Sequence, residues 1–400
     1  MKKTDVVIVG GGPSGATLGA LLARKGVSVH IVERAFFPRY HIGESLIPQV
    51  LDVLEESGAL ATVEAHGFLR KEGGVFRWGK RDKPWSFYFD ETKFRYRHTY
   101  AYQVIRAEFD ELLLAHARVC GVIVEEGVTA REMRVAAFSP AKHGVSLTVQ
   151  NGTGSLQEYH ARIVVDCSGQ AGWLASKERW REYDPVLRNV AVFSYFRGAR
   201  RLTGRDANGI FCEATRDGWF WNIPLHNGTN SVGLVTKAFR HLAPESFGER
   251  FAKAILRSRF ISEQLAVAER VEPIRLVRDY SYGARKLVAP GLVIVGDAGN
   301  FIDPVWSTGV FLATTGAKLA AAAITFWLAT GSVDPLASYE REVSELVERY
   351  REFVHYFYGS NDEPGDAFWK AYEVVEGRID PKDAFIRIVS GRLGTYCTAS

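Results

Sequence analysis

A glycine-rich segment near the start of the chain has the spacing of a phosphate-binding turn. It has the form GxGxxG, and its members are Gly10, Gly12, Pro13, Ser14 and Gly15. Glycines at these positions permit a tight turn, a close approach of the backbone to a pyrophosphate, and close packing of the helix that follows. The N–H groups and the positive dipole end of that helix favour phosphate. The segment therefore predicts a dinucleotide site.

Two charged residues follow the glycine turn at a position suited to ribose recognition. Glu33 ends the next apolar run, and Arg34 comes directly after it. A carboxylate at the end of a strand can accept hydrogen bonds from ribose hydroxyls, and it repels a 2′-phosphate. Residues 5–10, 11–26 and 27–33 have the order strand, helix, strand, which is a βαβ unit. We expect both Glu33 and Arg34 to contact the cofactor.

The rest of the chain contains two kinds of sheet pattern. In residues 74–102 and 190–236, aromatic and β-branched residues alternate with polar ones, which is typical of antiparallel sheet with one exposed face. Residues 106–119 and 309–329 have helical periodicity, and residues 334–358 form an amphipathic pattern with mixed charge. The patterns predict an α/β protein in which a Rossmann-like module is interrupted by an antiparallel substrate sheet and followed by a helical C-terminal segment.

Composition excludes several classes of protein. The 400 residues include 50 Lys and Arg and 46 Asp and Glu, and a net charge of +4 is too small to predict nucleic-acid binding. The longest later apolar stretch, 319–329, is about half a membrane span, and the start of the chain has no signal-like apolar segment. The four cysteines are far apart and form no ligand-like pair. We therefore expect no bound metal, no stable membrane insertion, and a cytoplasmic, reducing location.

Two later segments resemble signatures of the FAD oxidoreductases related to p-hydroxybenzoate hydroxylase. They are residues 165–169, which include Asp166, and the pair Gly296-Asp297. The resemblance implies that Asp297 binds the ribityl chain, that Asp166 and Gly296 lie at the cofactor, and that Arg106 contacts the flavin. A surface charge on a helix is the alternative for Arg106. Because the chain has a single GxGxxG, no second dinucleotide domain is available for NADPH, and we expect FAD.

These patterns predict the organisation of the chain. The FAD-binding module is expected in three parts, separated by segments of the substrate sheet. The predicted parts are FAD-binding 1–73, sheet segment 74–102, FAD-binding 103–185, antiparallel sheet 186–285, FAD-binding 286–330 and helical segment 331–400.

Four further segments together resemble the flavin-dependent halogenases, in particular members that act on phenolic or carrier-bound substrates. They are RYHIGESLIP at 39–48, Lys71 at the end of GFLRK, WxWxIP at 219–224 and FxxPxxSxG at 301–309. The resemblance implies an enzyme of secondary metabolism, such as antibiotic biosynthesis. In these enzymes reduced FAD, oxygen and chloride or bromide give hypohalous acid, which halogenates an electron-rich ring. Because no NADPH domain is visible, a separate flavin reductase is the expected partner.

The resemblance assigns the halide chemistry to a turn and a lysine, with Lys71 and Ser307 as the catalytic residues. The turn 307–309 opens a helix, so its backbone amides can hold an anion. Thr308 and Gly309 would bind the halide, and Gly309 would also lie at the cofactor. Lys71 would hydrogen-bond hypohalous acid as an ammonium or trap it as a haloamine. A solvated surface charge is the alternative for Lys71.

Other residues are placed around the site by the same resemblance. They are Glu44, Ser45, Trp219, Trp221, Pro304 and Trp306. The two tryptophans of WxWxIP alternate on a strand, so both face one side, where they would line the passage between flavin and substrate. Aromatic packing is their alternative role. The pair at 44–45 would form part of the flavin-side wall, or a hydrogen-bonded pair within a loop.

One position departs from the pattern of tryptophan halogenases. In those enzymes a glutamate precedes the Ser-Thr-Gly, and here the position is Trp306. The missing carboxylate argues against free tryptophan and for an activated ring. A tyrosyl or related phenolic unit, free or on a carrier protein, is therefore the expected substrate.

Three alternative functions share parts of these patterns. The first is an aromatic monooxygenase that takes hydride directly from NAD(P)H, with Lys71 as a surface charge. The second is a flavoprotein of the geranylgeranyl-reductase type, which would need a wide lipid groove. The third is a flavin-binding protein without turnover, because binding motifs can survive the loss of chemistry.

Overall fold

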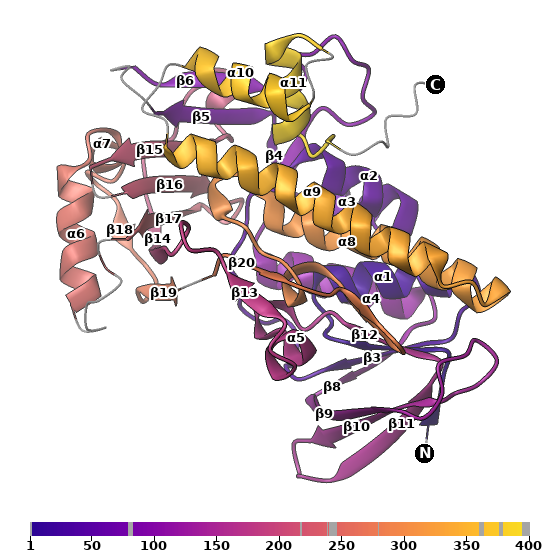
Figure 1. The fold of residues 1–400 in the computed structure, drawn as a ribbon. Helices are drawn as coiled ribbons and strands as arrows, with labels where there is room; N and C mark the ends of the chain where they lie inside the picture. The colour runs from indigo at the N-terminus through magenta and orange to yellow at the C-terminus, as the bar shows by residue number, and fades with distance from the viewer. Residues whose placement is uncertain are drawn as a thin grey trace.

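Two large sheets, joined by helices, organise the chain (Figure 1). They are seen in a computed structural model, which describes residues 2–78, 83–216, 218–237, 239, 246–278, 280–359, 364–375 and 379–393. One sheet has six strands and carries the nucleotide turn, and the other has eight strands and carries WxWxIP. The last residues of the expected helical segment, 394–400, lie outside the described part of the chain.

The six-stranded sheet is the expected Rossmann-like core. In spatial order its strands are β21 (Val288–Ala289), β22 (Leu292–Ile294), β12 (Ile163–Asp166), β2 (Val6–Val9), β3 (Val29–Glu33) and β8 (Ile123–Glu126). Neighbouring strands are parallel except for β21 with β22. Every residue of β2 and β12 is buried, which explains the apolar run VVIV in β2 and the run IVV that precedes Asp166 in β12.

Three helices pack together beside this sheet. They are α1 (Pro13–Ala23), α4 (Arg106–Val119) and α8 (Thr308–Thr330), with α1 in contact with both of the others. The predicted bounds of α4 are confirmed, and α8 extends one residue beyond its prediction at each end. By length and composition α8 could cross a membrane, but 67% of its most apolar 18-residue stretch is buried inside the protein. Burial of that kind is typical of a core helix.

A smaller sheet and two strand pairs accompany the two large sheets. The four-stranded sheet has the order β1 (Lys2–Lys3), β11 (Leu156–Ala161), β10 (Val145–Asn151) and β9 (Val128–Val135), and Figure 1 shows it beyond β3 and β8. The two pairs are β13 (Arg181–Tyr183) with β20 (Tyr282–Ala284) and β4 (Leu69–Lys71) with β7 (Ala101–Gln103). Helices α2 (Pro48–Ser57), α3 (Leu60–Ala65) and α5 (Trp173–Lys177) lie between these strands along the chain.

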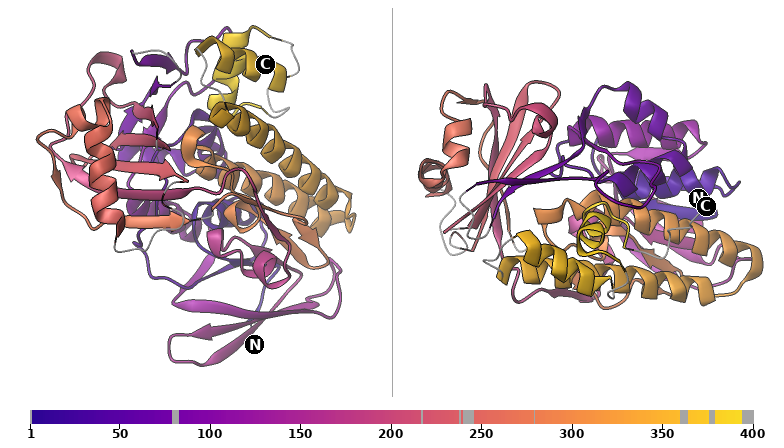
Figure 2. Two further views of the ribbon diagram at one scale, coloured as in Figure 1. Left: turned by 60° about the vertical axis from the view of Figure 1, so that its left-hand side comes forward. Right: turned by 90° about the horizontal axis from the view of Figure 1, so that it is seen from above.

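The eight-stranded sheet departs from the sequence prediction in its burial. Its path is β18 (Glu269–Arg270), β14 (Val190–Arg197), β17 (Thr229–Thr236), β16 (Gly218–Pro224), β15 (Ile210–Thr215), β5 (Gly73–Arg77) and β6 (Trp85–Tyr88), and β19 (Arg275–Arg278) pairs with β14. The expectation of an exposed face was wrong, because all eight residues of β17 are buried. Helices α6 (Phe247–Arg257) and α7 (Phe260–Gln264) cover the outer face (Figure 2). The pair of β15 with β5 is parallel, so the sheet is mixed.

The C-terminal helices cover the junction between the two halves. They are α9 (Asp334–Gly359), α10 (Pro364–Val374) and α11 (Pro381–Val389). The long helix α9 packs along α8, and α10 and α11 lie beside β5 and β6 (Figures 1 and 2). Phe385 of α11 contacts the rings of Trp85 and Phe87 on β6. The helical C-terminal segment is therefore an integral part of the core.

Candidate active site

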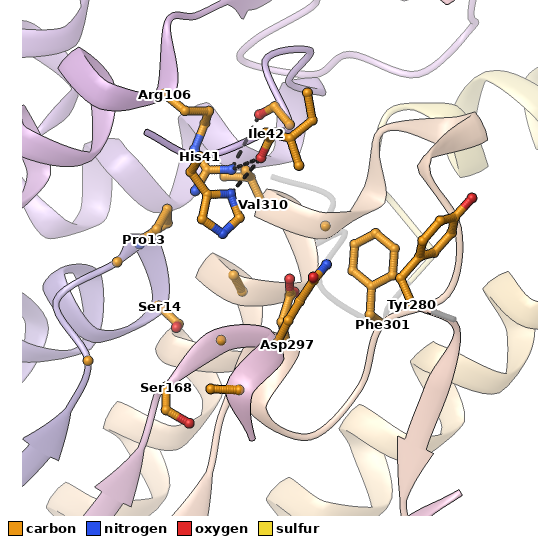
Figure 3. Close-up of a pocket in the computed structure, with 18 of the residues that line it drawn as sticks. Pro13, Ser14, His41, Ile42, Arg106, Ser168, Tyr280, Asp297, Phe301 and Val310 are labelled. Carbon is orange, nitrogen blue, oxygen red and sulfur yellow. Dashed lines mark hydrogen bonds between the residues drawn. The ribbon is translucent and has the colours of Figure 1, made fainter. Parts of the chain in front are cut away.

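A cavity of about 730 Å³ lies where the six-stranded sheet, α4, α8 and the eight-stranded sheet meet. Most of the predicted site residues line it: Gly10, Gly12, Pro13, Ser14, Glu33, Arg34, Glu44, Ser45, Arg106, Trp219, Trp221, Asp297, Pro304, Ser307, Thr308 and Gly309. Five predicted residues are not part of the lining: Gly15, Lys71, Asp166, Gly296 and Trp306. Figure 3 shows lining residues from distant segments of the chain, among them Ser14, Arg106 and Asp297, around one space.

Two positions of the glycine turn have no room for a side chain, because another part of the backbone packs directly against them. Gly10 has φ +106°, and a Cβ on it would lie 2.3 Å from the carbonyl oxygen of Cys167. A Cβ on Gly15 would lie 1.9 Å from the carbonyl oxygen of Gly10. Gly12 precedes α1, and no side chain of the described residues caps it. The first N–H groups of α1 are therefore available to a phosphate at the cavity.

Two carboxylates hold the ends of their strands in place. Glu33 accepts hydrogen bonds from the backbone N–H groups of Gly11, at 2.7 Å, and Ala35, at 2.8 Å. Asp166, which is completely buried behind the lining, accepts from the N–H groups of Ser168 and Leu174. Glu33 thus forms part of the cavity wall, whereas Asp166 shapes the loop that carries Ser168 into it.

Arg106 is buried at the cavity, which excludes the alternative of a surface charge. Its guanidinium donates two hydrogen bonds to Asp110, at 2.7 and 2.9 Å, and one to the carbonyl of Ile42 at 2.7 Å (Figure 3). Burial opposes its charge, but Asp110, with smaller contributions from Asp297 and Glu44, raises the pKa of Arg106. His41 lies beside it, and burial together with Arg106 lowers the pKa of His41 to about 4. Sequence reasoning did not single out His41, although it lies in the segment 39–48.

Asp297 brings an acidic group to the opposite side of the cavity. Burial raises its pKa to about 7, against the opposing effects of Arg106 and Arg181. It follows Gly296, whose φ of +67° and close approach to Ala313 and Ser14 favour glycine. Gly296 therefore brings the Asp297 turn against α1 and α8 without facing the cavity itself.

The start of α8 has the geometry of an anion site. Ser307 has left-handed backbone angles, φ 58° and ψ 32°, directly after the short 3-10 turn Pro304–Trp306. No side chain of the described residues caps the helix that begins at Thr308. Ser307 N–H is already used, since it donates to the carbonyl of Pro304. Because α8 has 23 residues, unpaired N–H groups at Thr308 and Gly309 and a full helix dipole are available at the cavity.

Lys71 is buried behind the cavity wall, so the alternative of a solvated surface charge is wrong. Its side chain is 2% exposed, and its ammonium donates to Ser45 Oγ at 2.8 Å and to the carbonyl of Leu46 at 2.9 Å. Ser45 itself lines the cavity. Among the described residues, no carboxylate pairs with Lys71, and burial lowers its pKa to about 7. The amine is therefore one hydrogen bond away from the cavity.

The buried pair at 44–45 and a tyrosine extend this wall. Glu44 is 2% exposed and accepts a hydrogen bond from the hydroxyl of Tyr195 on β14, while Ser45 accepts from Lys71. Burial raises the pKa of Glu44. Both residues line the cavity. Their side chains bond to Tyr195 and Lys71 in other segments, so the interpretation as a hydrogen-bonded pair within a loop is not supported.

Comparisons with known proteins identify the family. The family model for tryptophan halogenases matches residues 5–99 and 90–393. A tryptophan 2-halogenase from Chondromyces crocatus is 37% identical over 406 residues, covering 97% of this chain and 76% of that protein. The chain belongs to the flavin-dependent halogenases. The halogenase is also 30% identical to a 1H-pyrrole-2-carbonyl-[peptidyl-carrier protein] chlorinase from Pseudomonas fluorescens, over 89% of this chain and 84% of that protein.

A solved structure supports the same assignment. The halogenase resembles the FAD-dependent myxobacterial chondrochloren halogenase, with a TM-score of 0.83, 34% identity, and coverage of 98% of this chain and 91% of that one. Membership excludes the monooxygenase and the reductase as descriptions of the family. The uncapped turn at Gly12, the glycines that a Cβ would obstruct, and the buried Arg106 fit FAD in this cavity.

The tryptophans of WxWxIP line the halogenase cavity and also pack with each other. Their ring centroids are 6.0 Å apart, and Trp221 Nε1 donates to Ser231 Oγ. Trp219 Nε1 donates to the hydroxyl of Tyr358 at 2.6 Å. That hydroxyl donates to Asp303 at 2.9 Å, which connects α9 to the start of α8. This chain of hydrogen bonds has no local sequence signal, because it joins residues from three distant segments.

Trp306 is part of an aromatic cluster outside the cavity lining. Its ring stacks on Phe76 at 5.0 Å and contacts Phe353 and Phe357 of α9 and Phe385 of α11. The side chain is 3% exposed. The position at which tryptophan halogenases have a carboxylate thus holds the C-terminal helices against the eight-stranded sheet.

The buried Asp303 is expected to make the stability of the halogenase depend on pH. Burial raises its pKa to about 7, although Val305, Tyr358 and Asn189 donate to its carboxylate. Since the folded state binds this proton more tightly than the unfolded chain, the stabilisation is complete below about pH 4 and is lost as the pH rises through 7. The contribution is of order 2–4 kcal/mol.

Urea unfolding of Asp303→Asn between pH 5 and pH 8 tests this prediction. We expect the variant to show a smaller fall in unfolding free energy over that range than the unsubstituted protein. An equal fall in both proteins would show that Asp303 is ionised throughout. Asp366→Asn, in the first turn of α10, is the control and should leave the pH dependence unchanged.

Proposed function

We propose that this halogenase attaches chlorine or bromine to an activated aromatic ring, phenolic or similarly electron-rich, held free or on a carrier protein. The observation that carries the proposal is the buried Lys71, which is joined through Ser45 to the cofactor cavity. A relative that chlorinates a carrier-bound pyrrole supports the substrate class. The aromatic Trp306 supports it as well, because the ring must lose its proton without a carboxylate at that position.

The halide is proposed to bind at the start of α8. When bound, reduced FAD supplies with oxygen the oxidising power that converts the halide to hypohalous acid. The backbone N–H groups of Thr308 and Gly309 hold the anion beforehand, and the dipole of α8 stabilises its charge. Ser307 contributes through its left-handed backbone, which turns the chain so that these N–H groups face the cavity.

Lys71 is proposed to receive the hypohalous acid. Because its pKa is lowered to about 7, both the ammonium and the amine are populated at neutral pH. The amine nitrogen attacks the halogen, the N–halogen bond forms as the O–halogen bond breaks, and the hydroxide takes a proton from nitrogen to leave as water. The ring carbon then bonds to the halogen as the N–halogen bond breaks, the nitrogen takes a proton from solvent, and the ring proton is lost to solvent, which regenerates the amine. An ammonium that only hydrogen-bonds hypohalous acid would serve the same transfer.

A separate flavin reductase is proposed as the partner that supplies reduced FAD. The single glycine turn and the single dinucleotide fold around it support this, because they leave no second site of that kind for NADPH in the described part of the chain. We also propose a cytoplasmic location, which the three free thiols of Cys120, Cys167 and Cys212 support.

The test is mass spectrometry of a substrate panel incubated with the halogenase, FAD, a flavin reductase, NADH and bromide. The panel contains phenols and tryptophan, free and loaded on a carrier protein where possible. We expect a phenolic product with the bromine isotope doublet, absent when bromide is omitted. Bromination of tryptophan alone would contradict the proposed substrate class, and a product that gains oxygen without halide would contradict halogenation.

A further inference from the structure

Three side chains with metal-binding atoms meet outside the cofactor cavity. They are His66 at the end of α3, Glu108 in the first turn of α4, and His226 in the turn between β16 and β17. Glu108 Oε2 lies 2.7 Å from His66 Nε2 and 3.1 Å from His226 Nε2. The three ligand atoms all lie within 4.8 Å of one another. Segments from three separate parts of the chain thus present two imidazoles and a carboxylate to one point.

The surroundings of the cluster suit a cation. In the described part of the chain, no lysine or arginine forms an ion pair with Glu108; its partners are the two imidazoles. The buried ring of Phe68 packs against His66, with centroids 4.3 Å apart, and against His226 at 5.3 Å. Phe68 therefore holds both imidazole planes from one side and shields that side from water, while the side chains of the three ligands are 22–36% exposed on the other.

We propose that His66, Glu108 and His226 bind a zinc ion, with solvent as the fourth ligand. Zinc takes imidazole nitrogen and carboxylate oxygen in tetrahedral sites with bonds of about 2.0–2.2 Å, which separates neighbouring ligand atoms by about 3.3 Å. The atoms here need only small side-chain rotations to reach that spacing. Magnesium and calcium favour all-oxygen sites, so two imidazoles select a transition metal or zinc.

The ion would connect the two halves of the halogenase. Glu108 lies two residues after Arg106, which lines the cofactor cavity from α4. His226 follows β16, which carries Trp219 and Trp221 on the opposite wall. A bound zinc ion therefore cross-links the FAD-side helix to the strand that lines the passage. This role is independent of the proposed halogenation chemistry.

The first experiment measures zinc in the intact protein purified without a polyhistidine tag. The protein is incubated with zinc, excess metal is removed on a chelating resin, and bound zinc is determined by mass spectrometry of the elements. We expect one zinc per chain for the unsubstituted protein. Glu108→Gln and His226→Asn are expected to weaken zinc affinity by about 100-fold or more. His160→Asn is the matched control, because His160 faces Glu158 at 3.3 Å without a second imidazole, and it should retain zinc.

A second measurement keeps the outcome independent of variant folding. Cobalt is titrated into the unsubstituted protein, and a tetrahedral site should give ligand-field absorption that zinc then abolishes. Zinc should also raise the thermal unfolding midpoint of the unsubstituted protein and of His160→Asn, but not of Glu108→Gln. Substoichiometric zinc in the unsubstituted protein, or equal zinc in all variants, would overturn the proposal and leave a His66–Glu108 hydrogen bond beside a His226–Glu108 contact.

Discussion

Replacing Lys71 by methionine is expected to lower the rate of halogenated product by about 10³-fold or more, while reduced FAD is still oxidised. Methionine has a buried apolar side chain of similar length to that of Lys71. It lacks the nitrogen that donates hydrogen bonds to Ser45 and Leu46. The folded protein should be at least as stable as before, because it no longer buries an amine whose pKa burial lowers to about 7. Hypohalous acid should then escape into solvent, and an added thioether can trap it there.

The measurement is product formation by mass spectrometry, alongside oxygen consumption and thioether oxidation. Lys71→Ala should give the same chemical result with lower stability, because it also leaves a cavity. Arg70→Ala is the matched control, since Arg70 is the exposed neighbour on β4. Near-normal halogenation by Lys71→Met would refute the proposed role, whereas loss of both product and flavin oxidation would place Lys71 in cofactor binding.

Gly10→Ala is expected to weaken FAD binding by about 100-fold or more and to lower the unfolding free energy by about 3 kcal/mol or more. The new Cβ would lie 2.3 Å from the carbonyl oxygen of Cys167, a backbone atom that cannot move away. The turn must therefore open, and the N–H groups at the start of α1 lose their common direction. FAD titration by fluorescence and urea unfolding measure the two effects.

Gly26→Ala separates collision from backbone strain. Gly26 also has a left-handed φ, +80°, but nothing lies within 4 Å of the added Cβ. The substitution should lower the unfolding free energy by about 1–2 kcal/mol, which is the strain of a left-handed alanine. FAD binding should remain unchanged. Equal losses of stability and of FAD affinity in Gly10→Ala and Gly26→Ala would contradict this prediction. They would show that the added Cβ at Gly10 costs no more than the strain of a left-handed alanine.

Much of the FAD side could be predicted because its signals are local. The glycine turn, the apolar strands and the helix at 106–119 depend on spacing within a few residues, and the structure places each of them as expected. The turn 307–309 was predicted from the family resemblance, whereas the left-handed backbone of Ser307 became known only from the structure. The residues of these local motifs therefore meet at one cavity, since parallel strands bring their carboxyl ends to the same edge.

The sequence by itself determined the family and the cofactor and predicted most of the residues that line the cavity, whereas the tertiary structure decided the environment of each reactive group. Lys71 lies among charged residues in the sequence, which gives no sign that it is buried. It is buried because β4 pairs with β7, which places its ammonium against Ser45. Trp306 and the network of Asp303 with Tyr358 likewise depend on where α9 packs. Burial and hydrogen bonding between segments more than 25 residues apart arise from packing, and no local pattern encodes which segments will meet.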